Sequence, residues 1–268
     1  MESDHNTAIK SVRIIEGSPW KEAIITVLES GSPYEPWSSA GSVEDDDALV
    51  FMLDTDPVSV LSMVVTPGGS VTGFGTNPAP TLMELGTLNL FADFVVRPRA
   101  EEITYRGSPQ RIVDTIGGYK ISTVEALFGH TSLAAARVLL ESNGNCTACK
   151  NKLPLTDDDA VAQVHIRTVD SYLEQPSGKY RYPTDPADWP ATLCPTCHTL
   201  MRDGGFTNFL DFLFAGRPPC PNCGAHHSMS ASYGLISGGL PEPWLSGMGC
   251  CSDGRKPTWI CGECNHQW

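Results

Sequence analysis

Residues 146–149 read Cys-Thr-Ala-Cys, and the same Cys-x-x-Cys spacing returns at 194–197, 220–223 and 261–264. A structural zinc ion takes four tetrahedral thiolate or imidazole ligands, and one Cys-x-x-Cys turn offers two of them from a single tight loop. One such pair can arise by chance, whereas four pairs in one half of a chain form a strong metal-binding pattern. We therefore predict two structural zinc ions, with the ligands Cys146, Cys149, Cys194, Cys197, Cys220, Cys223, Cys261 and Cys264.

Two pairings of these motifs are open. A sequential pairing joins 146–149 with 194–197 and 220–223 with 261–264, whereas a cross-braced pairing interleaves them as RING-type modules do. We prefer the sequential pairing, because each half then resembles a self-contained module. The two remaining cysteines, Cys250 and Cys251, have no second pair nearby. They fit small buried residues in a turn better than a third metal or redox site.

The charge of the chain is acidic and unevenly distributed. The 268 residues carry 31 acidic and 18 basic side chains, for a net charge of −13. Residues 1–145 contain nineteen acidic and nine basic residues, a balance of −10. Acidic surfaces repel phosphate, which excludes a general electrostatic DNA binder. DNA or RNA is instead expected at the module of residues 146–217, and a basic protein partner at the acidic N-terminal region. The basic residues of that module are Lys150, Lys152, Arg167, Lys179, Arg181, Arg202 and Arg217.

The sequence also predicts a compartment. The N-terminal residues 1–5 are polar and acidic, unlike the start of a secretory signal. No apolar run approaches the ~20 residues that span a bilayer. Cysteines that serve as metal ligands indicate a reducing environment. We therefore predict a cytoplasmic protein without a membrane segment.

We expect an α+β chain with three parts. Residues 1–120 form a β-rich acidic domain, 121–217 a helical lead-in plus a zinc module, and 218–268 a zinc ribbon. The strands expected in the first part are 12–15, 24–28, 48–53 and 58–65, with a turn at 54–57 and an ambiguous segment at 81–91. The order of these elements resembles that of small barrels of the PUA and EVE type, which bind modified bases or RNA.

Two helices are expected around the first cysteine pairs. Thr131 or Ser132 caps an alanine-rich helix that runs to about Ser142. Aromatic and aliphatic residues between 206 and 214 recur at helical spacing, which predicts an amphipathic helix that packs between the two zinc modules.

Within residues 121–217, the stretch from the alanine-rich helix to about residue 214 resembles the zinc-containing form of the HNH nuclease family. The matching features are the cysteine pair 146–149, the segment Val164-His165-Ile166, and the segment 193–198, which reads Leu-Cys-Pro-Thr-Cys-His. This resemblance implies a treble-clef scaffold of the ββα-metal type and metal-assisted phosphodiester hydrolysis. It also implies that His165 is the general base and His198 a ligand of one catalytic divalent ion, Mg²⁺, Mn²⁺ or Ni²⁺.

The segment also departs from the family pattern. The position before the base, usually a metal ligand, is Val164, and a histidine often found four residues after His198 is Arg202. Asp170 and Asp188 are the nearby carboxylates that can replace the missing ligand. A missing ligand usually costs orders of magnitude in activity. The sequence thus favours a zinc protein of HNH ancestry that acts on nucleic acid with catalysis lost. The alternatives are a zinc-stabilised interaction scaffold and an active HNH endonuclease.

Overall fold

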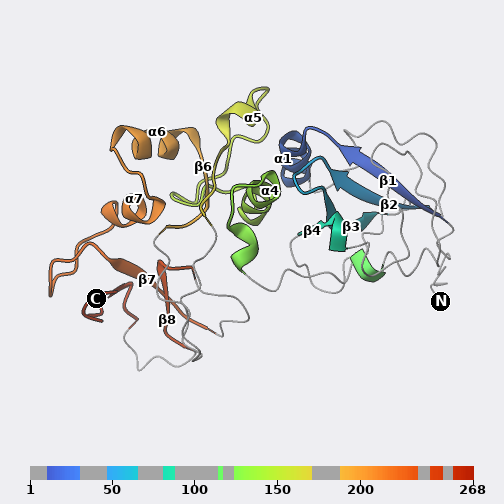
Figure 1. Ribbon diagram of the computed structural model, residues 1–268. Coiled ribbons are helices and arrows are strands. Elements are labelled where there is room, and N and C mark those ends of the chain that lie inside the picture. The colour runs from blue at the N-terminus through green and yellow to red at the C-terminus, as the bar shows by residue number, and fades with distance from the viewer. Residues whose placement is uncertain are drawn as a thin grey trace, which may run out of the picture.

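The structure is a computed structural model. It describes residues 11–30, 47–65, 81–87, 114–116, 124–170, 188–234, 242–249 and 256–268. Helices and sheets are mixed along this part of the chain (Figure 1), so the predicted α+β class is confirmed. Among the described residues, no helix has the length and hydrophobicity that crossing a membrane requires.

The N-terminal part is a four-stranded mixed sheet in the order β1-β2-β3-β4. Its strands are β1 (Ser11–Gly17), β2 (Asp47–Leu53), β3 (Ser59–Val65) and β4 (Leu82–Glu84). β1 and β2 run parallel, and the other two pairs run antiparallel. Residues 48–53 of β2 are all buried, which explains why that strand reads as an unbroken apolar run. The described strands leave β1 and β4 at the two edges, so the small barrel stays a prediction.

The strand expected at 24–28 is wrong, because these residues belong to helix α1 (Trp20–Ser30). Their β-branched side chains favour a strand locally. Ala23, Ile24 and Val27, however, are buried together at helical spacing, and this tertiary packing decides the outcome. A residue outside the helix caps its first turn, because Asp54 Oδ1 accepts a 2.7 Å hydrogen bond from the backbone N–H of Trp20.

Helix α4 (Ser132–Glu141) connects the sheet to the zinc modules. As predicted, Thr131 caps it and accepts a hydrogen bond from the backbone N–H of Ala134 at 3.1 Å. Arg137 Nη2 donates to the carbonyl of Leu82 in β4 at 3.0 Å. α1 and α4 pack on each other between the sheet and the later elements (Figure 1). One hydrophobic cluster therefore runs from the sheet into the first zinc module.

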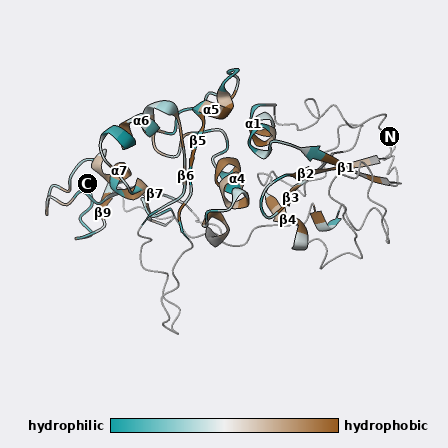
Figure 2. Cartoon of the chain, turned by 45° about the horizontal axis from the view of Figure 1, so that its top comes forward, coloured by the Kyte–Doolittle hydropathy of each residue, from teal (hydrophilic) through white to brown (hydrophobic). Residues whose placement is uncertain are grey.

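The remaining elements are short. They are η2 (Val124–Leu127), α5 (Ala160–Gln163), β5 (His165–Arg167), β6 (Ala191–Leu193), α6 (Pro195–Asp203), α7 (Phe209–Ala215), β7 (Ser228–Ser232), β8 (Leu245–Gly247) and β9 (Trp259–Cys261). β5 pairs with β6, and the last three strands form a sheet in the order β8-β7-β9. Hydrophobic residues gather on the large sheet and α4, whereas α6 is mostly hydrophilic (Figure 2).

The helix predicted between residues 206 and 214 forms, but it begins later, at Phe209. Gly205 follows α6 and adopts a left-handed φ of 72°, which glycine does readily. The side chain of Asn208 then caps the start of α7. Phe206 thus lies before the helix and packs on Phe212 at a ring distance of 5.6 Å. Phe209 meets Trp244 at 5.7 Å, which joins the two zinc modules as expected. The domain boundaries at 120/121 and 217/218 stay predictions.

Candidate metal centres and the histidine pocket

The eight predicted ligands gather in two four-cysteine groups, 146/149/194/197 and 220/223/261/264. Within each group all sulfur atoms lie within 4.8 Å of one another. Measured Sγ–Sγ distances are 3.8 Å for Cys149–Cys194 and 3.6 Å for Cys223–Cys261. A tetrahedral zinc with Zn–S bonds of about 2.3 Å places its sulfurs about 3.8 Å apart. The geometry fits two structural zinc ions in the sequential pairing.

Three of the four motifs adopt the same loop. The first cysteine donates its backbone N–H to the carbonyl five residues later, at 2.8–2.9 Å for Cys146, Cys220 and Cys261. The residue after the second cysteine donates back to the carbonyl of the first, and it has a positive φ: 62° at Lys150, 75° at Gly224 and 56° at Asn265. This turn points both thiols to one side of the loop, where one ion can bind both.

The fourth motif lies at a helix start instead. Cys194 is the N-cap of α6, Pro195 occupies its first turn, and Cys197 is buried one turn along. Proline suits this position, where its missing N–H costs nothing. The first centre therefore joins a loop to a helix N-terminus, whereas the second joins two loops.

The surroundings of the thiols shift their pKa values in both directions. Burial and the neighbouring cysteines raise the pKa of the Cys197 thiol well above its ordinary value. A backbone hydrogen bond at His266 and the side chain of Asn222 lower the pKa of Cys264 to about 6. Zinc binds thiolates, so an ion at the centre would offset the cost of ionising Cys197. Of the described histidines, none joins the ligand groups. Cys250 and Cys251 lie outside the described residues.

The two candidate catalytic histidines lie together. His165 on β5 and His198 on α6 stack with ring centroids 3.8 Å apart and planes at 11°. Pairing of β5 with β6 places His165 opposite Leu193, directly before the α6 motif. Both rings line a cavity of about 560 Å³. Its other lining residues are Lys21, Ala162, Val164, Ile166, Arg167, Thr168, Leu193, Met201, Arg202 and Phe206.

Lys21 is the cavity residue that sequence reasoning missed. It comes from α1 in the N-terminal part, and no motif marks it. Only the packing of α1 against α5 brings it to the histidines. Burial, the His198 ring and the Lys21 ammonium, in that order, lower the pKa of His165. The cavity thus collects cationic and imidazole groups.

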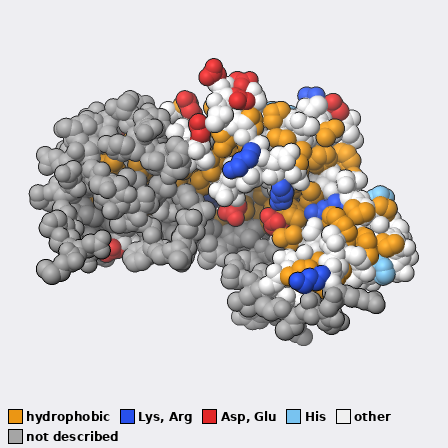
Figure 3. Space-filling model, turned by 180° about the vertical axis from the view of Figure 1, so that it is seen from behind, with side chains coloured by type: hydrophobic (Ala, Val, Ile, Leu, Met, Phe, Trp, Pro, Cys, Tyr) orange, Lys and Arg blue, Asp and Glu red, His pale blue; other side chains and the backbone are white. Residues whose placement is uncertain are grey.

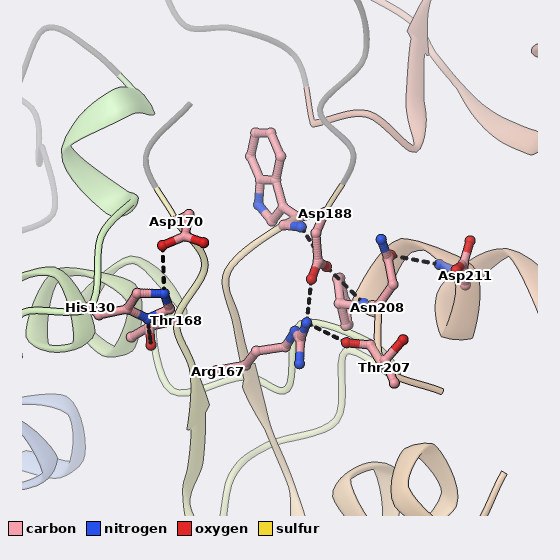
Figure 4. A network of polar contacts seen from close by, with 10 residues as sticks. His130, Arg167, Thr168, Asp170, Asp188, Thr207, Asn208 and Asp211 are labelled. Atoms are coloured by element: carbon pink, nitrogen blue, oxygen red, sulfur yellow. Dashed lines mark hydrogen bonds and ion pairs between the residues drawn. The ribbon is translucent and has the colours of Figure 1, made fainter. Parts of the chain in front are cut away.

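The missing metal ligand is not replaced by the described residues. Val164 is fully buried in the core, and its apolar side chain offers no ligand atom. Asp170 pairs with His130 Nε2 at 2.8 Å. Asp188 accepts a hydrogen bond from Arg167, as Figure 4 shows. It also accepts hydrogen bonds from the backbone N–H groups of Trp189 and Phe209. No carboxylate is among the described residues that line the cavity. Magnesium prefers oxygen ligands, so this lining suits an anion better.

The basic residues that the structure describes in the module of residues 146–217 do not form one continuous patch. Arg167 and Arg202 line the histidine cavity, whereas Lys150 lies over the Trp244 ring at 5.5 Å, in a second cavity with Glu141 and Glu242. On the face shown in Figure 3, basic side chains alternate with acidic and uncharged ones. Lys179 and Arg181 lie outside the described residues. Among the described basic residues, Lys21, Arg167 and Arg202 come together at the histidine cavity, and Lys150 lies apart from them.

Comparison with protein-family models, with curated proteins and with solved structures finds no match to this chain.

Proposed function

We propose that this chain is a zinc-stabilised protein of HNH-nuclease ancestry that binds nucleic acid through a phosphate group in the His165–His198 cavity, without hydrolysing it. The observation that carries the proposal is the lining of that cavity. Lys21, Arg167 and Arg202 line the cavity with the stacked imidazoles, and no carboxylate is among its described lining residues. Arg167 and Arg202 also pair with Asp188 and Asp203, which do not line the cavity. Cationic donors around a hollow of this kind suit a phosphate.

The ancestry is supported by the local arrangement. A loop motif, an antiparallel strand pair that carries His165, and a helix that begins at Cys194 and carries His198 follow one another in the order of the HNH pattern. The four thiols of the first centre lie where the loop meets that helix. In this proposal the zinc ion holds the strand pair and the helix together and takes no part in the chemistry.

The loss of hydrolysis follows from the ligands. A catalytic divalent ion needs two or three protein ligands beside the phosphate. Of the described cavity residues only His165 and His198 are of a type that binds such ions, and the family role of His165 is that of the base. With His198 as the one remaining protein ligand, a catalytic divalent ion would bind weakly. The histidines then act as hydrogen-bond partners of the phosphate.

The test is a binding and cleavage assay on the purified protein. Fluorescence anisotropy with single-stranded DNA, duplex DNA and RNA measures affinity, and Arg202→Met probes the cavity. The exposed Lys152, which is not a cavity residue, supplies the matched control Lys152→Met. We expect salt-dependent binding that Arg202→Met weakens about tenfold, a typical cost of losing a charge-assisted hydrogen bond, while Lys152→Met changes it less than twofold.

Two results would contradict the proposal. Cleavage with Mg²⁺, Mn²⁺ or Ni²⁺ that disappears in His165→Ala would show an active endonuclease. No binding at low salt by protein that carries two zinc ions per chain would favour the interaction scaffold. In that case a basic protein partner of the acidic N-terminal part becomes the target of the search.

A further inference from the structure

Lys21 on α1 reaches into the zinc module. Its Nζ donates hydrogen bonds to the carbonyls of Val161 and Val164, the latter at 2.7 Å. These carbonyls lie at the C-terminal end of α5, where a helix leaves backbone acceptors without intrahelical partners. A cation is the favoured partner there, because the helix end carries partial negative charge. The ammonium therefore satisfies acceptors that are more than 130 positions away in the sequence.

The position of these carbonyls matters because His165 comes next in the chain. Val164 is the last residue before β5, and its side chain is fully buried. Strand pairing with β6 holds His165 on one side. Lys21 holds the backbone just before it from the cavity side, since Lys21 itself is a lining residue. Two contacts thus fix the backbone around His165. Lys21 binds the carbonyl of Val164 just before it, and β6 pairs with it at Leu193.

Lys21 is itself held by the N-terminal part. The preceding residue, Trp20, donates its backbone N–H to Asp54 Oδ1 at 2.7 Å, and Ser18 Oγ donates to Asp54 Oδ2 at 2.6 Å. Ala23 and Ile24 are buried against the core. Burial lowers the pKa of Lys21, because removing the ammonium from water disfavours its charged form.

We infer that Lys21 is a positioning residue for His165, and that the N-terminal part is thereby a structural component of the histidine pocket. The inference deepens the proposed function, because it makes phosphate binding depend on residues outside the HNH-like module. Its core, the placement of the His165 ring by Lys21, does not require nucleic acid.

The test compares Lys21→Met, Lys21→Arg and the control Lys152→Met in the full zinc-loaded chain. Carbon-13 labelling of histidine reports the His165 and His198 rings by NMR, since their stacking shifts both sets of resonances. Hydrogen exchange reports the amides of residues 161–167. We expect Lys21→Met to move the His165 resonances and to speed exchange at Val164 and Ile166 at least tenfold, with zinc content unchanged. Lys21→Arg keeps the cation and is expected to recover part of both effects.

Unchanged His165 resonances and unchanged exchange in Lys21→Met would overturn the inference, whatever the protein binds. Loss of zinc or of the whole fold in Lys21→Met would also overturn it, since the residue would then serve general stability. If the wild-type protein binds no oligonucleotide, the proposed function fails, and the NMR result still decides the role of Lys21. If it binds, Lys21→Met is expected to lower affinity about tenfold, in step with the resonance shifts.

Discussion

The two four-cysteine groups, the candidate zinc centres, present the same set of thiols in different surroundings. In the first, Cys146 and Cys197 belong to the hydrophobic cluster that runs into the N-terminal sheet, and the histidine cavity lies against its helix. In the second, no cysteine belongs to that cluster, Cys223 and Cys264 are exposed, and the adjoining sheet has three short strands. We therefore expect the first centre to stabilise the core and the pocket. The second is expected to stabilise mainly its own module, which meets the cluster through Trp244.

The largest effect is expected from Cys146→Ser, because Cys146 is fully buried in the shared cluster. Structural zinc in small peptides contributes roughly 10–16 kcal/mol of binding free energy, so loss of this ion costs several kcal/mol of stability. We expect zinc content to fall by one ion per chain and the main thermal transition to drop or disappear. Metal analysis and calorimetry measure both. A transition at the wild-type temperature would contradict the central place of this centre.

Cys261→Ser is the matched change at the second centre, where the cysteine is also buried. We again expect the loss of one zinc ion, but with a local result, because this centre lies outside the shared cluster. Hydrogen exchange should accelerate in residues 220–268 and stay slow in β2 and α4. Equal acceleration of hydrogen exchange in β2 would show that the second centre stabilises the shared cluster as much as the first, which would contradict the difference between them.

Gly262→Ala tests the packing beside the second centre. A Cβ at Gly262 would lie 2.6 Å from the His227 ring, which is itself held by Glu263 at 3.0 Å and by Phe214. Overpacking of this kind costs about 1–3 kcal/mol. We expect weaker zinc retention against a competing chelator. The double change Gly262→Ala with His227→Ala removes the clash and should restore retention; no recovery would place the cause elsewhere.

The smallest effect is expected at the α4 cap. Thr131→Ala removes the hydrogen bond to the Ala134 N–H and should cost about 1 kcal/mol in urea unfolding. The control is Thr156→Ala in an exposed loop. Because α4 joins the sheet to the first centre, both should lose stability together in a single transition. Two separate transitions would show that they unfold independently.

The sequence predicts the two four-cysteine groups well, because the Cys-x-x-Cys spacing is a local property that survives any packing. The cap at Thr131 and the β2–β3 pair are likewise local, and they are confirmed. The error at residues 24–28 has a tertiary cause, since β-branched propensity yields to the burial of Ile24 and Val27 on a helix.

The cavity was predictable only in part. His165 and His198 are named by the resemblance to the HNH pattern, and the structure stacks their two rings in one cavity. Lys21 could not be found, because a lysine in a helix carries no signature until a distant segment packs on it. The suggested replacements, Asp170 and Asp188, are engaged by His130 and Arg167 instead, and spacing gives no sign of those partners.

The most direct test of the proposed function is an NMR titration of the histidine rings with a short single-stranded oligonucleotide. The chain has 7 histidines, so carbon-13 labelling of this residue gives a resolvable spectrum. We predict saturable shifts of His165 and His198 that need about tenfold more oligonucleotide in Arg202→Met, with no cleavage when divalent ions are added. Unmoved His165 and His198 resonances at saturating oligonucleotide would contradict the phosphate-binding cavity.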